Sequence, residues 1–149
     1  MCGIVGLHLR NPELYPRLGE LLTGMLIEMT DRGDESAGAA VYGDPRWSPS
    51  GCMTVSFVPD ANSRALTTGI AEKDAAAALT DALGSPVEVV DAGPTLIANV
   101  AREIGADRLR QAIQSAYPDS LIAGFGEHLA VFKGVGLPRD LAVAYGLPQ

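Results

Sequence analysis

The order of apolar patterns between residues 54 and about 125 constrains the fold of this chain most. The predicted strands and helices of this region, in chain order, span 54–58, 72–83, 87–90, 95–100, 106–117 and 121–125. The first helix is Ala-rich and stops at Gly84-Ser85-Pro86, and the second ends before Pro118. The resulting order β-α-β-β-α-β is typical of a ferredoxin-like split βαβ unit.

Further helices and strands are predicted outside this region. One helix carries a stripe of apolar residues at helical spacing, which are Leu14, Leu18, Leu21, Leu22, Met25, Leu26 and Met29. We expect it to be regular from about Pro16, to end at Gly33, and to place the stripe in the core. Strands are predicted over 39–42 and 128–132, and turns with a short helix from 133 onward.

The N-terminus reads Met1-Cys2-Gly3-Ile4-Val5-Gly6. Initiator methionine is usually removed before a small residue, so the mature chain is expected to begin at Cys2. Cys2 would then carry a thiol and a free α-amine, whose pKa near 7.7–8.0 lets it accept a proton at neutral pH. Ile4, Val5 and Leu7 predict a short buried strand. The alternative is that Cys2 is an ordinary buried thiol.

A charged loop, Asp31-Arg32-Gly33-Asp34-Glu35-Ser36, precedes the strand predicted over 39–42. Charged residues between two buried segments face solvent, a partner or a site. No metal is expected here, because no His or Cys stands near these carboxylates in the sequence. Arg32 either supports a site or is a surface or helix-capping residue.

The pairing of Cys2-Gly3-Ile4-Val5-Gly6 with Arg32-Gly33-x-x-Ser36-Ala37-Gly38 resembles the opening of class II glutamine amidotransferases, most closely the amidotransferase domain of glutamate-synthase-like proteins. The resemblance implies that Cys2 is the nucleophile towards glutamine, with its own α-amine as base. It also implies that Gly3, Arg32, Gly33 and Ser36 support the site, and that no cofactor or metal is used. Glu35 stands where the family commonly has Asp.

The same resemblance implies an α+β fold, as part of the four-layer αββα sandwich of N-terminal-nucleophile hydrolases. Residues 1–53 would form the N-terminal part of the sandwich, and 54–126 would be the inserted ferredoxin-like βαββαβ subdomain. Residues 127–149 would return to the sandwich and end in turns. Cutting the sandwich at this point would leave apolar sheet surface and strand edges exposed.

The family's Asn-Gly oxyanion pair is missing, because the three asparagines precede Pro12, Ser63 and Val100. The family's His-Thr-Arg segment is missing as well. Losing one oxyanion donor typically costs about 2.7–4 kcal/mol of transition-state stabilisation. The chain is therefore expected to act with a second protein chain, which supplies the rest of the domain and a synthase that accepts the ammonia, or to be a fragment of a longer chain. Two alternatives stand beside this reading: a catalytically inactive relative that binds a small molecule or a regulatory partner, and a plain interaction subunit.

The formal net charge of −7, without a basic cluster, argues against nucleic acid or an anionic membrane as partner. The sequence has no apolar run of membrane-spanning length and no signal-peptide pattern, so a cytoplasmic location is expected. Cys52 is expected to be a buried strand residue that forms no disulfide.

Overall fold

A four-stranded antiparallel sheet forms the larger part of the computed structural model, which describes residues 3–32 and 35–147. Its elements follow in the order β2 (Cys52–Val58), α2 (Glu72–Leu83), β3 (Glu88–Ala92), β4 (Thr95–Ala101), α3 (Ala106–Ala116) and β5 (Leu121–Gly126). The strands lie in the order β3-β4-β2-β5. Each helix therefore connects two parallel strands that have one antiparallel strand between them.

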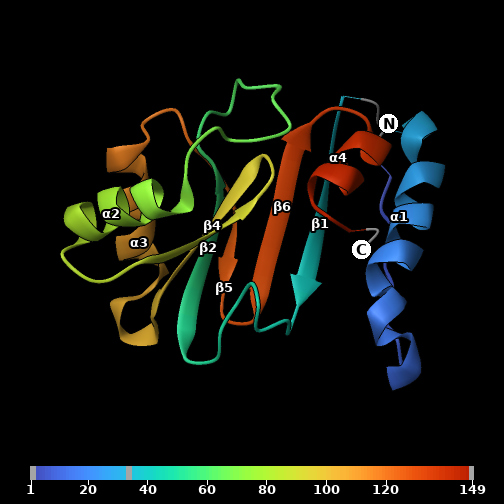
Figure 1. Ribbon diagram of the computed structural model, residues 1–149, viewed down its shortest axis with the longest axis horizontal. Helices are drawn as coiled ribbons and strands as arrows, with labels where there is room; N and C mark the ends of the chain where they lie inside the picture. The colour runs from blue at the N-terminus through green and yellow to red at the C-terminus, as the bar shows by residue number, and fades with distance from the viewer. Residues whose placement is uncertain (1–2, 33–34, 148–149) are drawn as a thin grey trace.

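Helices α2 and α3 cover one face of this sheet, as Figure 1 shows. Their apolar residues Leu79, Leu109 and Ile113 are fully buried against Val55 and Leu96 of the central strands. Successive residues of a strand point to opposite faces of the sheet. The face under α2 and α3 is apolar, whereas the opposite face carries hydroxyl and amide side chains. Burial of the apolar face is the main contribution to the stability of this layer.

The smaller sheet pairs β1 (Ser36–Tyr42) with β6 (Leu129–Val135) in antiparallel register, from Ser36 opposite Val135 to Tyr42 opposite Leu129. It lies on the face of the larger sheet that α2 and α3 leave open, together with α4 (Pro138–Ala144) and, outermost, α1 (Leu18–Glu28) (Figure 1). Three short 3-10 helices complete the order: η1 (Pro12–Arg17), η2 (Thr30–Arg32) and η3 (Arg102–Ile104). The α+β class expected from the sequence is thus the class of the structure.

Side-chain hydroxyl groups of the larger sheet attach β6 to that sheet. They bond to the edge of β6 that does not pair with β1. The N–H of Val131 donates to Oγ of Ser56 at 2.9 Å. Thr95 Oγ1 accepts from the N–H of Lys133 and donates to the carbonyl of Lys133, both at 2.9 Å. Buried side-chain hydroxyls therefore satisfy backbone groups that a neighbouring strand would otherwise satisfy.

An apolar cluster fills the space between the two sheets and α4. Phe132 lies at its centre and packs edge-on against Trp47 at 5.1 Å between ring centroids, and against Tyr145 at 5.5 Å. Ile97 and Leu141 complete it from the larger sheet and from α4. Burial raises the pKa of Tyr145, so its phenol stays neutral and donates to the carbonyl of Ala37.

Three expectations about burial were wrong. Residues 3–10 form no strand, and Ile4 is 95% exposed, because a strand needs a sheet neighbour and no described residue pairs with this segment. The Leu and Met stripe of α1 is only half-buried, since α4 and the segment ending at Leu147 cover part of it. Cys52 is half-buried because it is the first residue of β2 and not an interior one.

The expectation of exposed strand edges agrees with β1. Within the described residues β1 pairs only with β6, and its residues Ser36, Gly38, Ala40 and Tyr42 are exposed. No helix among the described residues is long and apolar enough to cross a membrane.

Candidate functional site

Gly3 packs closely against Arg32 in the described part of the molecule. A Cβ atom placed on Gly3 would lie 2.8 Å from Sδ of Met29 and 3.1 Å from Cβ of Arg32. The turn η2 sets the position of Arg32, whose N–H donates to the carbonyl of Met29 at 2.9 Å. The absence of a side chain at position 3 is therefore what allows the N-terminal segment to lie beside Arg32.

Ser36 begins β1 a few residues after Arg32. It stands opposite Val135 in the β1–β6 ladder, and the N–H of Gly136 extends the contact by donating to the carbonyl of Glu35 at 3.0 Å. The predicted site residues Cys2 and Gly33 lie outside the described residues. Of the predicted set, the structure thus brings Gly3 and Arg32 into contact and places Ser36 at the start of the adjoining strand.

The start of β1 and the end of β6 lie at one end of the molecule. Figure 1 shows this end at the top, together with the green loop that joins β2 to α2. The carboxyl end of β2 also points there, because β2 leads directly into that loop. Segments that are far apart in the sequence therefore meet at the end that carries Gly3, Arg32 and Ser36.

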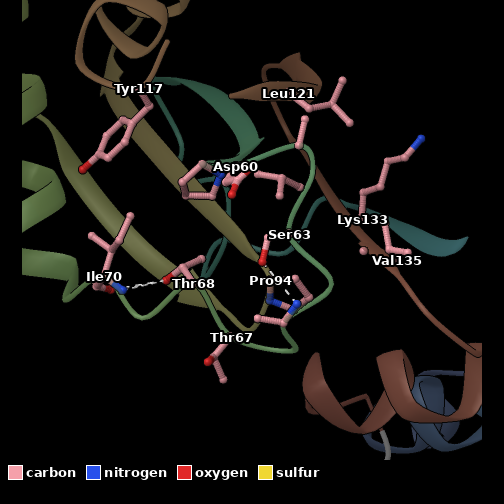
Figure 2. Close-up of a pocket in the computed structure, with 15 residues that line it drawn as sticks. Asp60, Ser63, Thr67, Thr68, Ile70, Pro94, Tyr117, Leu121, Lys133 and Val135 are labelled. Atoms are coloured by element: carbon pink, nitrogen blue, oxygen red, sulfur yellow. Dashed lines mark hydrogen bonds between the residues drawn. The ribbon is translucent and has the colours of Figure 1, made fainter. Parts of the chain in front are cut away.

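A pocket of about 240 Å³ opens at this end. One wall is the loop from Pro59 to Ile70, and the facing wall is the end of β6 from Lys133 to Val135 (Figure 2). Pro94 and Tyr117 close it from the β3–β4 turn and from the end of α3. Burial, followed by the nearby Asp74 carboxylate, raises the pKa of Tyr117, so the phenol is neutral at physiological pH.

Hydrogen bonds hold the loop wall in place. The N–H of Ala61 donates to the carbonyl of Asp119 at 2.9 Å, and the N–H of Thr68 donates to the carbonyl of Gly93 at 3.1 Å. Inside the loop, Oδ1 of Asp60 accepts from the N–H of Asn62 at 2.9 Å. These bonds tie both halves of the loop to the body of the molecule.

This end of the molecule carries charged groups of both signs. Asp60 and Lys133 are exposed residues that line the pocket, and Arg32 is exposed beside Gly3. Over the part of the chain that the structure describes, none of the three takes part in an ion pair. The same residues contain no cluster of three or more His, Cys, Asp or Glu suited to a metal ion. The arrangement is suited to holding a small polar or charged molecule.

The sequence did not indicate Asp60 or Lys133 as site residues. The one signal in the sequence was the long connection between Val58 and Glu72, because long ordered loops in compact domains are often functional. Nothing in the sequence around Lys133 indicates that it faces this loop. Its position follows only from the way β6 packs across the larger sheet.

The chain is similar to the glutamine amidotransferase-like protein GlxB of Rhizobium meliloti (strain 1021), with 37% identity over 145 residues. The match covers 97% of this chain but 44% of the relative, so the chain spans less than half the length of the curated relative it matches. No protein-family model and no solved structure matches the chain. The similarity supports the glutamine amidotransferase-like relationship that the N-terminal motifs indicated.

Proposed function

We propose that the chain is the nucleophile-bearing part of a class II glutamine amidotransferase and that Cys2 attacks the side-chain amide of glutamine. One observation carries this proposal. Gly3, which is bonded to Cys2, packs against Arg32, so the two motifs of the resemblance meet in space. The similarity to a glutamine amidotransferase-like protein over almost the whole chain supports the same function.

The proposed reaction begins with removal of Met1, which frees the α-amine of Cys2. The amine takes the thiol proton, and the thiolate attacks the amide carbon of glutamine to form a tetrahedral intermediate. The C–N bond then breaks, and the proton held by the amine leaves with the nitrogen as ammonia. Water hydrolyses the remaining thioester, which gives glutamate and restores the thiol. No step uses a cofactor or a metal.

In this proposal Gly3, Arg32, Gly33 and Ser36 support the nucleophile. Gly3 gives the N-terminal segment its close approach, and Cβ and Cγ of Arg32 lie beside that segment. Ser36 begins β1, and Gly33 follows Arg32 in the sequence. The location we propose is the cytoplasm, where free glutamine is available.

We further propose that the sandwich of N-terminal-nucleophile hydrolases is formed by residues 1–53 and 127–149, with 54–126 as an inserted subdomain. The pairing of the strands supports this division. Strand β1 from the first range pairs with β6 from the last range, while β2, β3, β4 and β5 form a sheet of their own. The sequence between β1 and β6 can therefore be an insertion that leaves their pairing intact.

The proposed partner is a polypeptide that supplies the oxyanion donors and the rest of the sandwich, attached to a glutamate-synthase-like enzyme that accepts the ammonia. The open edge of β1 supports such a partner. Its sequence Ser-Ala-Gly-Ala-Ala-Val-Tyr has no charged residue and no proline, which are the usual features that keep a strand edge from pairing. The half-buried stripe of α1 offers further apolar surface.

A second candidate is a catalytically inactive relative that acts as a binding or regulatory subunit. The absence of an Asn-Gly dipeptide from these 149 residues favours it, since an amide-splitting site needs an oxyanion hole. The two candidates differ in the reactivity of Cys2 towards a glutamine analogue.

The test is labelling by a diazoketone analogue of glutamine, followed by peptide mass spectrometry. The first candidate predicts a thioether on Cys2 that is protected by glutamine, that rises with pH through the α-amine titration near 7.7–8.0, and that speeds up when the complementary polypeptide is added. Cys52 is the internal reference, because it is a half-buried thiol without a base on its own residue. Cys2→Ser should abolish labelling and Cys52→Ser should leave it unchanged.

Iodoacetamide provides the control for simple accessibility, since it reacts with any exposed thiolate. Suppose that Cys2 reacts with iodoacetamide, but that the analogue labels it no faster than Cys52 and glutamine does not protect it. This result would refute the enzymatic proposal and leave the proposal of a binding subunit. An intact Met1 on protein from its native host would remove the proposed base and have the same consequence.

A further inference from the structure

The sulfur atom of Met29 lies against the N-terminal segment. A Cβ atom placed on Gly3 would lie 2.8 Å from Sδ of Met29. Because a Cα–Cβ bond adds about 1.5 Å, Cα of Gly3 itself is within about 4.3 Å of that sulfur. The φ angle of Gly3 lies outside the left-handed region, so the close approach and not the backbone conformation requires glycine here. The thioether therefore sets how near the N-terminal segment comes to the end of α1.

Met29 also supports the turn that carries Arg32. It is the C-cap residue of α1, and its carbonyl accepts from the N–H of Arg32 at 2.9 Å. The side chain of Met29 thus holds Gly3 while its main chain holds Arg32. The two motifs of the candidate site meet at this residue, although it belongs to neither motif.

The sulfur of Met29 is open to oxidants. Met29 ends the outermost helix of the molecule (Figure 1), is half-buried, and is not among the described residues of either apolar cluster. A peroxide can therefore reach it without unfolding of the core. In that reaction the sulfur donates an electron pair to one peroxide oxygen, the O–O bond breaks and an S–O bond forms. Hydrogen peroxide leaves as water, so the thioether is oxidised by two electrons to a sulfoxide and the peroxide is reduced.

The sulfoxide does not fit the contact that the thioether makes. Oxidation adds an oxygen atom to a sulfur that already lies against Gly3, and it turns an apolar group into a polar one. A polar oxygen held in an apolar contact lacks a hydrogen-bond partner, so the side chain turns towards water. Gly3 then loses its support at the end of α1.

We propose that Met29 is an oxidation site and a positioning residue, whose thioether holds the N-terminal segment beside Arg32 and whose conversion to the sulfoxide by a peroxide releases that segment. Cys2 moves with Gly3 through their peptide bond, so oxidation switches the site off. A methionine sulfoxide reductase with a dithiol as reductant restores the thioether and the site. The effect on Cys2 rests on the proposed function, whereas the contact between Met29 and Gly3 does not.

The first measurement follows the contact itself in a Cys2→Ser chain, which has no reactive N-terminal thiol. The nuclear Overhauser effect between the CH groups bonded to the Met29 sulfur and Hα of Gly3 reports their proximity. Hydrogen peroxide should abolish this effect, and methionine sulfoxide reductase with dithiothreitol should restore it. Met25→Leu is the matched control, because Met25 lies one turn earlier on α1, and it should respond in the same way. A nuclear Overhauser effect that persists in protein with fully oxidised Met29 would overturn the proposal.

The second measurement is labelling of Cys2 by the diazoketone analogue after treatment with peroxide and then dithiothreitol. Dithiothreitol returns a reversibly oxidised thiol but leaves the sulfoxide in place, and peptide mass spectrometry restricts the count to chains with an intact Cys2 thiol. Labelling should become about tenfold slower or more, since a misplacement of about 1 Å can cost on the order of 100-fold in rate. Iodoacetamide should react with Cys2 no more slowly than before, which a general loss of structure or access would not explain.

Variants of Met29 assign the effect to its sulfur. Met29→Gln carries an amide oxygen in place of the sulfoxide oxygen and should label slowly without peroxide. Met29→Leu keeps an apolar side chain of similar volume without sulfur, so its rate should be equal before and after peroxide. Met25→Leu retains Met29 and should lose rate as the unmodified chain does. A peroxide-sensitive Met29→Leu chain would overturn the proposal, because another residue would then be responsible.

The two measurements also separate this inference from the proposed function. If the Overhauser effect disappears on oxidation and returns on repair while the analogue labels Cys2 in no chain, the contact stands and the enzyme is refuted. If glutamine protects Cys2 from the analogue and oxidation of Met29 changes neither measurement, the enzyme stands and this inference is refuted.

Discussion

Replacing Thr95 with Val tests whether hydroxyl groups attach β6 to the larger sheet. Valine has nearly the same shape, so the change removes the two hydrogen bonds to Lys133 and leaves the packing in place. A hydrogen bond contributes about 0.5–1.5 kcal/mol net, and a buried group left without a partner costs about 1–3 kcal/mol. Thr95 is fully buried, while Lys133 lies partly in water. The expected loss is therefore about 2–3 kcal/mol of the free energy of unfolding.

The assay is urea denaturation followed by circular dichroism, with the slope of the transition as a check that the unfolding reaction is unchanged. Thr95→Ser keeps the hydroxyl and should cost only about 1 kcal/mol, for the lost methyl group. Ser56→Ala removes the single bond to Val131 and should cost about 1–2 kcal/mol. Exposed Ser115→Ala is the matched control and should stay within about 0.5 kcal/mol of wild type.

Two results would refute this reasoning. If Thr95→Val unfolds at the same urea concentration as Ser115→Ala, the hydroxyl does not stabilise the contact between β6 and the larger sheet. If Thr95→Ser is as unstable as Thr95→Val, keeping the hydroxyl does not preserve the stability that is attributed to the two hydrogen bonds.

Two further predictions concern a tight turn and an acid-sensitive turn. Gly93→Ala should lower the free energy of unfolding by at least about 2 kcal/mol, because φ is +68° and the new Cβ would lie 2.6 Å from the carbonyl oxygen of Ala144. Gly51→Ala is the control, with φ +80° and open space around the new Cβ, and should lower it by only about 1–2 kcal/mol. Equal losses in urea denaturation would contradict the predicted clash. The Arg46 guanidinium holds the pKa of Asp44 below its ordinary value, so this contribution to stability is complete above about pH 5 and is lost as pH falls through the lowered pKa. The stability difference between wild type and Asp44→Asn should therefore shrink between about pH 5 and pH 2, and a difference independent of pH would contradict it.

Elements that depend on local pattern were predictable from the sequence. The helix predicted over 72–83 is α2 residue for residue, because an Ala-rich run meets Gly84, which ends it at φ +71°. The strands around Gly93-Pro94 were also placed to within about two residues, since the turn and the apolar runs specify them together. Such features need no knowledge of what packs against them.

Features that depend on distant partners were not predictable in the same way. Ile4 and Val5 have strand-like residues, but no described segment pairs with them. The contact of Gly3 with Arg32 agrees with a family resemblance and not with any local pattern. Asp60 and Lys133 share a pocket only because a loop and a strand far apart in sequence converge, and neither neighbourhood contains a signal for the other.

The attachment of β6 through Ser56 and Thr95 also fixes the position of β6 along the larger sheet. Purely apolar surfaces tolerate sliding, whereas hydrogen bonds hold donor and acceptor within a few tenths of an ångström. A strand advances by about 3.3 Å per residue and its N–H groups alternate in direction, so a slip of one residue would break the bonds to Val131 and Lys133 together. Strand β6 can therefore shift along the larger sheet only by whole residues, so these hydrogen bonds keep Lys133 at a fixed position relative to the loop.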